Sequence, residues 1–316
     1  MIRRHLLSIL FGAIVVTGSS FASADDDGKV RVFVLAGQSN MEGHGIVAAD
    51  PARNEGKGSL AYVAEHQPES PIAAWRAGDG SWRERDDVLI SYLDRHGRLR
   101  PGFGANEDRI GPELGFGTVV GDRFDAPVLL VKLAWGGKSL GADFRPPSAG
   151  GEAPGPYYVE LVERTKKLLA NLDETFPELA GREIELAGIG WHQGWNDRVN
   201  QAFNDEYEKN LACLIRDLRR EFDSPRLPFV IAETGMSGES ETHPRALSLM
   251  RAQAAVAEYD EFRGTVAFVG TRAFYRPAEE SPSGQAYHWN TNAETYWLIG
   301  EGMGTAMLSL LDEAAK

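Results

Sequence analysis

Residues 30–44, VRVFVLAGQSNMEGH, constrain the fold more than any other stretch of the sequence. The first seven of these residues carry one charge, at Arg31, which makes them too apolar for a strand with one face in water. They predict a central strand of a parallel sheet that helices cover on both sides. The strand ends abruptly at Gly37, so Ser39 follows the carboxyl end of a buried strand, where open α/β sheets hold their ligands. Ser39 is therefore a candidate nucleophile, although a serine in this position also serves as a helix cap.

Four further apolar segments have the length and composition of buried strands, and helical patterns alternate with them. The expected strands are residues 126–134, 183–190, 227–232 and 265–269, and the expected helices are residues 157–172, 203–222, 244–258 and 293–311. This alternation predicts an α/β fold: a single doubly wound, parallel, five-stranded sheet with helices on both faces, in the flavodoxin-like order 2-1-3-4-5. We expect residues 25–316 to form one domain, since no linker or repeat interrupts them. Residues 43–110 show little periodicity, and their Trp75 and Trp82 are expected to pin a loop to the core.

The N-terminus has the three parts of a secretory signal. Arg3 and Arg4 precede an apolar run over residues 6–16, and a small-residue cleavage site ends at Ala24. We expect removal of this signal peptide, which makes the mature protein secreted or periplasmic; a mature mass that still includes the signal would contradict this. No later segment is apolar enough for stable insertion into a membrane.

Composition excludes several other functions. The formal net charge is −13 and no long run of Lys or Arg occurs, so we expect no nucleic-acid partner. The single cysteine, Cys213, lies on the apolar face of an expected helix and should be a buried, inert thiol. The histidines show no paired metal-ligand spacing, and we expect neither a metal nor another cofactor. His44, like three other histidines, carries no sequence signal.

Residues able to perform acyl transfer follow three expected strands and precede the last expected helix. They are residues 37–40, residues 136–139, residues 192–194 and His288. The carboxyl ends of parallel strands meet at one edge of a sheet, so these segments should converge. Acyl transfer needs an activated hydroxyl, a base and donors to an oxyanion. Ser39 can supply the hydroxyl and His288 the base, while the donors can be the N–H groups of Ser39 and Gly137 and the side-chain amide of Gln193.

With these motifs, the chain resembles the SGNH hydrolase superfamily, and within it the branch of sialate O-acetylesterases and acetyl-xylan esterases, carbohydrate esterase family 6. The matching motifs are GQSNM at residues 37–41, WHQG at residues 191–194, the Gly136-Gly137 turn and the Gly111-Pro112-Glu113 helix start. The resemblance covers residues 30–310. It implies hydrolysis of acetyl esters on carbohydrates without a metal, with Ser39 as nucleophile and His288 as base. It also implies that Gly137 and Gln193 belong to the oxyanion hole, with Gly136 in place of Gly137 if the turn is offset by one residue.

Two positions depart from the pattern that this resemblance predicts. The superfamily usually has an aspartate three residues before the histidine, where this chain has Gln285, and the branch normally has a glutamate after Gln-Gly, where this chain has Trp195. Neither familiar acid is therefore present to orient His288. Asp197 is the first candidate to replace it and Glu233 the second. A neutral acceptor, such as Gln285 itself or a backbone carbonyl, would instead leave a serine–histidine pair.

Four residues next to the candidate catalytic groups are expected to bind substrate: Gln38, Asn40, His192 and Trp195. Trp195 and Trp289 could form an aromatic wall against a sugar, or pack the site only. The favoured function is a secreted carbohydrate O-acetyl esterase that forms an acetyl-enzyme, with acetylated carbohydrate as its partner. The alternative is a catalytically impaired, glycan-binding protein on the same fold, and a lipid or thioester hydrolase is a third, weaker option. The sequence identifies neither the sugar, the acyl position nor the oligomeric state.

Overall fold

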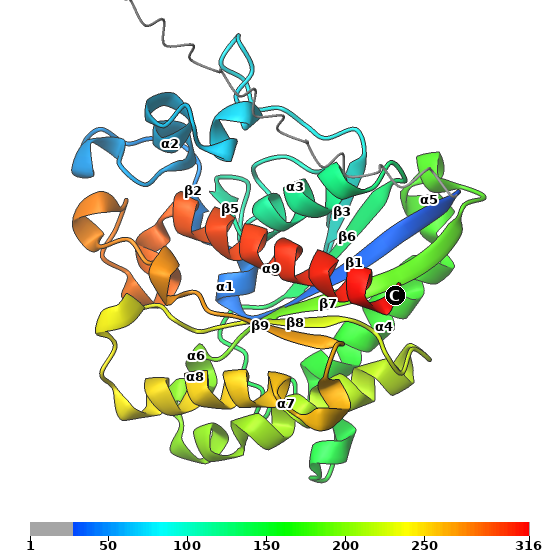
Figure 1. Ribbon diagram of the computed structural model, residues 1–316. Coiled ribbons are helices and arrows are strands. Elements are labelled where there is room, and N and C mark those ends of the chain that lie inside the picture. Colours follow the sequence, from blue (N-terminus) through cyan, green and yellow to red (C-terminus); the bar gives the residue numbers. More distant parts are fainter. Residues whose placement is uncertain (1–27, 316) are drawn as a thin grey trace, which may run out of the picture.

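The computed structural model describes residues 28–315, so the expected signal peptide lies outside the described residues. A seven-stranded sheet crosses the middle of the molecule (Figure 1), and its strands are β1 (Lys29–Gly37), β3 (Val88–Tyr92), β4 (Arg95–Arg98), β6 (Val128–Ala134), β7 (Glu183–His192), β8 (Phe229–Ala232) and β9 (Val266–Val269). Their order is β4-β3-β6-β1-β7-β8-β9. All neighbours are parallel except β3 and β4, which form an antiparallel hairpin. A separate two-stranded ribbon pairs β2 (Gly45–Ile46) with β5 (Arg109–Ile110).

The five predicted strands are confirmed, and their order β6-β1-β7-β8-β9 is the predicted 2-1-3-4-5. The predicted number of strands was wrong, because β3 and β4 extend the sheet beyond β6 to seven. All five residues of β3 are buried, so it shows no alternation, and β4 is a charged edge strand, RHGR. The turn between them is Leu93-Asp94, with Leu93 at φ +53°, and it lacks the glycine that usually marks a hairpin.

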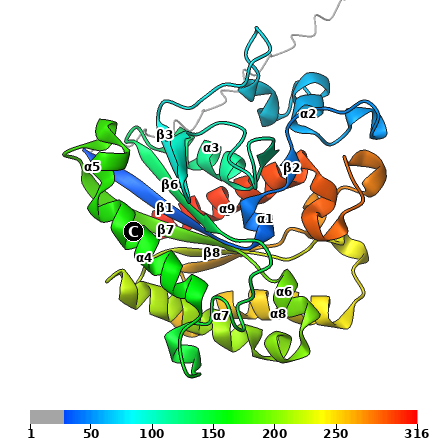
Figure 2. The ribbon, with the colours of Figure 1, turned by 180° about the vertical axis from the view of Figure 1, so that it is seen from behind.

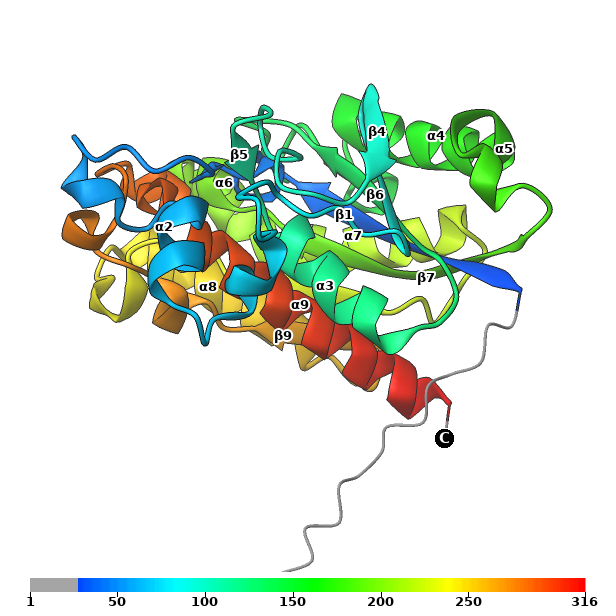
Figure 3. The same ribbon diagram turned by 90° about the horizontal axis from the view of Figure 1, so that it is seen from above.

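Helices cover both faces of the sheet, as predicted (Figures 2 and 3). On one face lie α3 (Glu113–Arg123) and α9 (Ala293–Ala314), and on the other lie α4 (Pro156–Ala170), α7 (Gln201–Glu221) and α8 (Pro244–Ala257). Side chains of β1 alternate between the two cores: Val32 and Val34 pack with the α4, α7 and α8 residues, and Phe33 and Leu35 with the α3 and α9 residues. The all-apolar sequence of β1 follows from this double burial.

Burial of Cys213 and of Trp75 agrees with the sequence, and a side chain caps the last helix. Cys213 is a buried free thiol on α7, and Trp75 is buried with its ring edge against Trp297 of α9. The side chain of Asn292 caps α9 by accepting the N–H of Thr295 at 3.1 Å. Within the described part of the chain, no helix is both long and apolar enough to span a membrane.

One fully buried lysine, Lys132, lies on β6 next to the central strand β1, and burial lowers the pKa of its ammonium group while the Glu113 carboxylate opposes that change. The Nζ atom of Lys132, on β6, donates to the Glu113 carboxylate at 2.6 Å, to the carbonyl of Glu42 at 2.6 Å and to that of Phe103 at 2.7 Å. Neither the Lys132 nor the Glu113 side chain is exposed to water. Glu42 is the last residue of the short helix α1 (Ser39–Glu42), so this buried charge ties α1 to the sheet.

Substitution of Lys132→Met should lower the free energy of unfolding by about 3–5 kcal/mol, because it leaves the Glu113 carboxylate buried without its cation. Urea unfolding monitored by circular dichroism measures this change. Arg263→Met is the matched control, since Arg263 and its partner Asp260 are 80% and 92% exposed and their ion pair should contribute less than about 1 kcal/mol. Equal losses in the two variants would contradict the role given to Lys132.

Candidate functional site

Helix α1 begins directly after the central strand β1, at the carboxyl edge of the sheet (Figure 1), and Ser39 is its first residue. Gly37 makes this turn possible, because a Cβ atom at that position would collide with the carbonyl oxygen of His192 on the neighbouring β7. Ser39 keeps 9% of its surface exposed. Its backbone N–H is among the first of the helix, which have no carbonyl partner within the helix and are free to meet an anion.

Asn40 links the Ser39 turn to the segment that holds His288. Its Nδ2 atom donates to the carbonyl of Tyr287 at 3.1 Å, across 247 positions of the sequence. Its Oδ1 atom accepts from the hydroxyl of Tyr296 at 2.8 Å, and this hydroxyl also lies 3.4 Å from the His288 carbonyl. The structure therefore brings together the segments that carry the predicted nucleophile and the predicted base, and the hydrogen bonds of Asn40 join them.

The chain around His288 has an unusual backbone. Three consecutive residues after it, Trp289, Asn290 and Thr291, have positive φ values of 52°, 54° and 56°, a costly conformation for residues other than glycine. Asn290 holds this bend by donating from Nδ2 to the carbonyl of Arg276 at 3.0 Å. The bend directs Trp289 into the core, where it is fully buried, and leaves the His288 ring at the surface of the site.

His288 is partly buried, and burial lowers its pKa to about 4. Its backbone N–H donates to the carbonyl of Gln285 at 2.8 Å, but no hydrogen bond joins its ring to the Gln285 side chain or to any carboxylate among residues 28–315. In the same described part of the chain, the Ser39 hydroxyl and the His288 ring do not form a hydrogen bond. Such contacts are often long in a site without substrate and tighten when it binds.

A residue that the sequence does not single out, His44, lies against the His288 ring. The rings of His44 and His288 are stacked with centroids 3.7 Å apart and planes 7° apart. The Nε2 atom of His44 also lies 3.9 Å from the carboxylate of Glu42. Burial, together with the charges of neighbouring groups, lowers the pKa of His44 to about 3, so its ring is neutral. Nothing in the sequence near residue 44 indicates this contact, because His288 comes from a distant segment.

The predicted glycine turn lies beside α1. Gly137 has φ +71°, which favours glycine, and its carbonyl accepts a hydrogen bond from Nδ2 of Asn196. The N–H of Gly136 donates to the Glu42 carboxylate, while burial raises the pKa of that carboxyl group. The N–H of Gly137 has no acceptor among the described residues. It is therefore free to donate to a ligand, whereas the N–H of Gly136 is already used.

Asp197 is fully buried and binds the loop that follows the glycine turn. Its carboxylate accepts the N–H groups of Leu140 at 2.9 Å and Gly141 at 2.7 Å, and the Nε2 group of Gln193 at 2.5 Å. Burial outweighs these bonds and raises the pKa of Asp197 to about 6. None of its hydrogen bonds goes to His288. The predicted role of Asp197 as the acid that orients His288 stays a prediction, and these contacts favour a role as a loop anchor.

The side-chain amide of Gln193 is likewise engaged within the protein. Besides Asp197, its Nε2 atom reaches the carbonyl of Lys138 at 3.0 Å and Oε1 of Gln38 at 3.3 Å. The Oε1 atom of Gln38 also accepts the N–H of Gly194 at 3.1 Å. Both glutamines are buried. In this conformation they join the ends of β1 and β7, and their predicted roles at the oxyanion and the substrate stay predictions.

His192 and Glu233 have structural partners. His192 is fully buried, its Nδ1 atom lies 3.4 Å from the carbonyl of Ala232, and burial lowers its pKa to about 4. Glu233 forms an ion pair with Arg272 at 3.3 Å and accepts the N–H of Thr271 at 2.9 Å. These contacts favour the interpretation of Glu233 as a salt-bridge residue rather than the second candidate for the acid.

Tyr287, and not Trp289, lies beside Trp195. The ring of Trp195 is 5.6 Å from that of Tyr287, which is 40% exposed. Trp289 is fully buried, so of the two alternatives left open for it the structure favours packing over a wall against a sugar. The left-handed bend after His288 explains the exchange, since it turns Trp289 inward.

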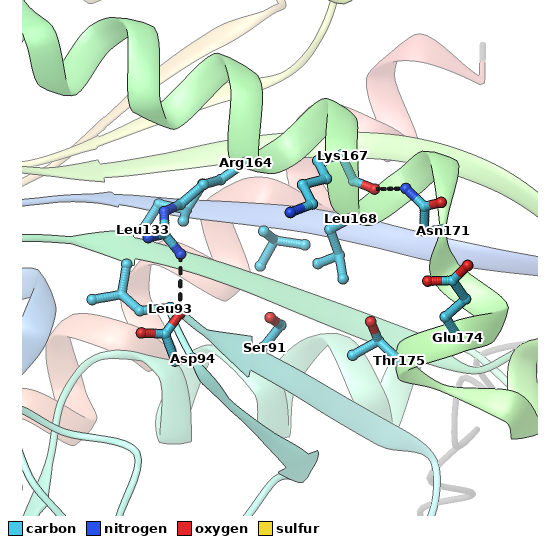
Figure 4. A pocket seen from close by; sticks show the side chains of 11 residues that line it. Ser91, Leu93, Asp94, Leu133, Arg164, Lys167, Leu168, Asn171, Glu174 and Thr175 are labelled. Carbon is cyan, nitrogen blue, oxygen red and sulfur yellow. Dashed lines mark hydrogen bonds and ion pairs between the residues drawn. The ribbon is translucent and has the colours of Figure 1, made fainter.

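Among residues 28–315, no three His, Cys, Asp or Glu side chains are grouped so that they could hold a metal ion. A cavity of about 330 Å³ lies between α4, α5 (Leu172–Thr175) and the strands β3 and β6 (Figure 4). Its polar rim includes the ion pair between Arg164 and Asp94. Its lining includes none of the residues just described, so this hollow is separate from the candidate site.

Fold and geometry define an α/β protein with one polar site at the carboxyl edge of its sheet. The chain belongs to the carbohydrate esterase, sialic acid-specific acetylesterase family, whose model matches residues 29–308. Hydrolysis of acetyl esters on carbohydrates is the activity of this family.

The chain is also similar to one protein in sequence and to three solved structures in fold. A probable carbohydrate esterase of Arabidopsis thaliana, At4g34215, is 26% identical over 220 residues, which cover 67% of this chain and 75% of that protein. Its crystal structure aligns with a TM-score of 0.58 at 18% identity, over 88% of this chain and 98% of that one. The structure of NanS aligns with a TM-score of 0.57 at 15% identity over 91% and 99% of the two chains. XAC1771, a carbohydrate acetylesterase from Xanthomonas citri, aligns with a TM-score of 0.50 at 14% identity over 87% of this chain and 55% of that one.

Substitution of Asp197→Ala should lower the free energy of unfolding by about 1–3 kcal/mol, because the N–H groups of Leu140 and Gly141 lose their acceptor. Since Asp197 does not bind His288, the acid limb of the pH profile for aryl acetate hydrolysis should not move. Urea unfolding and the pH profile measure the two effects, with the exposed Asp260→Ala as control. A shift of the acid limb to lower pH would identify Asp197 as the acid after all, since removal of a carboxylate partner lowers a histidine pKa.

Proposed function

We propose that this protein is a carbohydrate O-acetyl esterase in which Ser39 is the nucleophile and His288 the general base. The observation that carries the proposal is the pair of hydrogen bonds through Asn40, which keeps the turn of Ser39 against the segment of His288. Membership of a carbohydrate esterase family supports the reaction. The position of Ser39, after a buried parallel strand and at the start of a helix, supports its role.

In the proposed reaction, the Ser39 hydroxyl attacks the acetyl carbonyl while His288 takes its proton. The oxyanion that forms on the carbonyl oxygen accepts hydrogen bonds from the N–H groups of Ser39 and Gly137. His288 then returns the proton to the departing sugar oxygen, which leaves an acetyl group on Ser39. A water molecule, deprotonated by His288, attacks this acetyl-enzyme. His288 then gives that proton to the Ser39 oxygen as the ester bond breaks, so that acetate leaves and both side chains return to their starting state.

We also propose that His288 works without a hydrogen-bonded carboxylate. Asp197 and Glu233 have other partners, and Gln285 occupies the usual place of the acid. The site is then a serine–histidine pair whose base is held by packing and by the backbone. Loss of the acid can cost several orders of magnitude in rate, so a modest turnover number is expected.

Two features near the pair suit a sugar. Trp195 and the exposed Tyr287 present an aromatic face, on which the apolar side of a sugar ring can stack. A cavity of about 280 Å³ lies along the segment that follows His44, and its lining includes Ile46, Arg109 and Pro282. Arg109 offers this cavity a cation. Sialic acid, which the family description names, carries a carboxylate that neutral sugars lack.

The protein is proposed to act outside the cytoplasm. The support for this proposal is the composition of residues 1–24, which has the three parts of a secretory signal and ends at Ala24. Acetylated polysaccharides and glycoconjugates are substrates that such a location makes accessible.

Ser39→Ala should reduce acetate release by roughly 10⁴-fold or more, because the covalent route is lost. Acetate is measured from acetylated sialic acid, acetylated xylan and an aryl acetate, and circular dichroism confirms that the variant folds. Ser309→Ala is the matched control, since Ser309 is an exposed serine near the C-terminal end of α9, where its hydroxyl donates to the carbonyl of Thr305.

A wild type no faster than Ser39→Ala would exclude the esterase mechanism. If both forms then bound an acetylated glycan equally well, the alternative of a glycan-binding protein without turnover would hold. Preferential hydrolysis of long-chain acyl esters would instead favour the lipid or thioester hydrolase.

The activity should persist to unusually low pH. His288 acts as a base only when neutral, and burial lowers its pKa to about 4, so kcat/KM should stay level from pH 7 to about pH 5 and fall as the pH drops through 4. A base with the ordinary histidine pKa would already lose half its activity near pH 6.5.

The folded fraction must be measured at each pH, because the low pKa values of His44 and His192 also affect stability. A histidine whose pKa is lower in the folded than in the unfolded state makes the protein less stable as the pH falls below about 6.5. Loss of kcat/KM near pH 6.5 in protein that is still folded would contradict the proposed environment of His288.

A further inference from the structure

We propose that His44 is a positioning residue for His288, and that the Glu42–His44 pair performs the orienting role that a hydrogen-bonded carboxylate plays in other serine esterases. This inference rests on the proposed function, since it takes His288 as the general base. His44 touches His288 rather than the reacting atoms, so its effect is exerted through the base.

The ring contact restricts His288 directly. Two rings with centroids 3.7 Å apart and planes 7° apart are in van der Waals contact over their whole faces. A His288 ring that rotated about its Cβ–Cγ bond would strike the His44 ring. Tyr287 lies against His288 as well, with a centroid distance of 4.4 Å. The plane of the imidazole is thus set by packing, whereas a triad sets it with a hydrogen bond.

His44 is itself held by α1 and by the turn that follows it. Glu42 lies 3.9 Å from the His44 Nε2 atom, and the backbone of Glu42 is bound by the buried Lys132. The intervening Gly43 has φ +90°, and a Cβ there would collide with Gly111. Glycine is therefore required in this turn, which carries His44 from the end of α1 to the position where its ring stacks on His288.

An unpaired atom indicates that the His44 ring is not present for its own stability. The Nε2 atom of His44 is buried and has no hydrogen-bond partner among the described residues. A buried polar atom without a partner costs stability, and an apolar side chain of similar size would avoid that cost. What the ring supplies is a flat face parallel to the ring of His288.

The charges around His44 are consistent with this role. The groups that face it are Glu42 of α1, Arg109 of β5, Lys132 of β6, Tyr296 of α9 and His288. Because His44 stays neutral above pH 4, protonation of His288 does not create two adjacent charges. The His288 imidazolium that forms during the reaction then faces a neutral ring rather than a second cation.

Two variants of His44 distinguish the contribution of the flat ring face from that of the ring nitrogens. In His44→Ala, the stack is lost and water reaches His288, so kcat for an aryl acetate should fall about tenfold with little change in KM. The acid limb of the pH profile should move from about pH 4 towards 6.5, since burial no longer lowers the His288 pKa. His44→Phe keeps a flat ring and should retain most of kcat and the low acid limb. His66→Ala is the matched control, because His66 also stacks on an aromatic ring, that of Tyr62, but is exposed on α2 (Leu60–His66).

Two results would overturn the proposal: His44→Ala with the kcat and acid limb of the wild type, or equal losses in His44→Ala and His44→Phe, which would assign the effect to the nitrogens. If His44→Ala does not fold, the kcat of His44→Phe is compared with those of the wild type and of Ser39→Ala. A His44→Phe variant as inactive as Ser39→Ala would contradict the stacking role. An inactive wild type would reject the proposed function instead.

NMR titration of His288 would still test the stack if the wild type were inactive. The proposal requires a His288 pKa near 4 in the wild type and in His44→Phe, and a higher value in His44→Ala. Equal pKa values in all three proteins would refute it.

Discussion

The buried ammonium group of Lys132 determines where α1 lies, and the candidate site depends on that position. A charge without access to water needs full compensation, and Lys132 finds it in the Glu113 carboxylate and two backbone carbonyls. One of these carbonyls belongs to Glu42, the last residue of α1. The side chain of Glu42 in turn binds the Gly136 N–H and lies next to His44. A single desolvated cation thereby fixes the serine turn, the glycine turn and the histidine stack relative to the sheet.

Much of this architecture could be predicted from the sequence, because it follows from where apolar residues lie. β1 is buried on both faces, and its unbroken apolar run indicates this directly. β3 and β4 escaped prediction for opposite reasons. β3 is only five residues long and lies among charged residues, and β4 is a polar edge strand whose hairpin turn contains Leu93 in a left-handed conformation rather than a glycine. Neither strand carries the pattern that local sequence reasoning requires.

Residues of the candidate site could be predicted only where the motif that indicates them lies within one short stretch of sequence. Ser39 and His288 belong to short motifs at the end of a strand and before a helix, and the structure brings these segments together through Asn40. The stack of His44 on His288 joins two segments far apart in the chain, so no local pattern reveals it. The exchange of Trp289 for Tyr287 depends on three left-handed residues without glycine, a strained bend that their residue types do not indicate.

The engagement of Gln193 and Asp197 changes where the oxyanion would find its donors. The Gln193 amide has two hydrogens and three acceptors within the protein, and Asp197 holds the loop after the glycine turn through two N–H groups. Main-chain donors at Ser39 and Gly137 then remain for a substrate, and they need no reorganisation because buried side chains fix their loops. In the proposed mechanism such preorganisation matters more than in a full triad. His288, whose pKa burial lowers to about 4, would accept a proton less readily than a base with a pKa near 7. The proposal therefore assigns a larger share of the stabilisation of the transition state to the oxyanion donors.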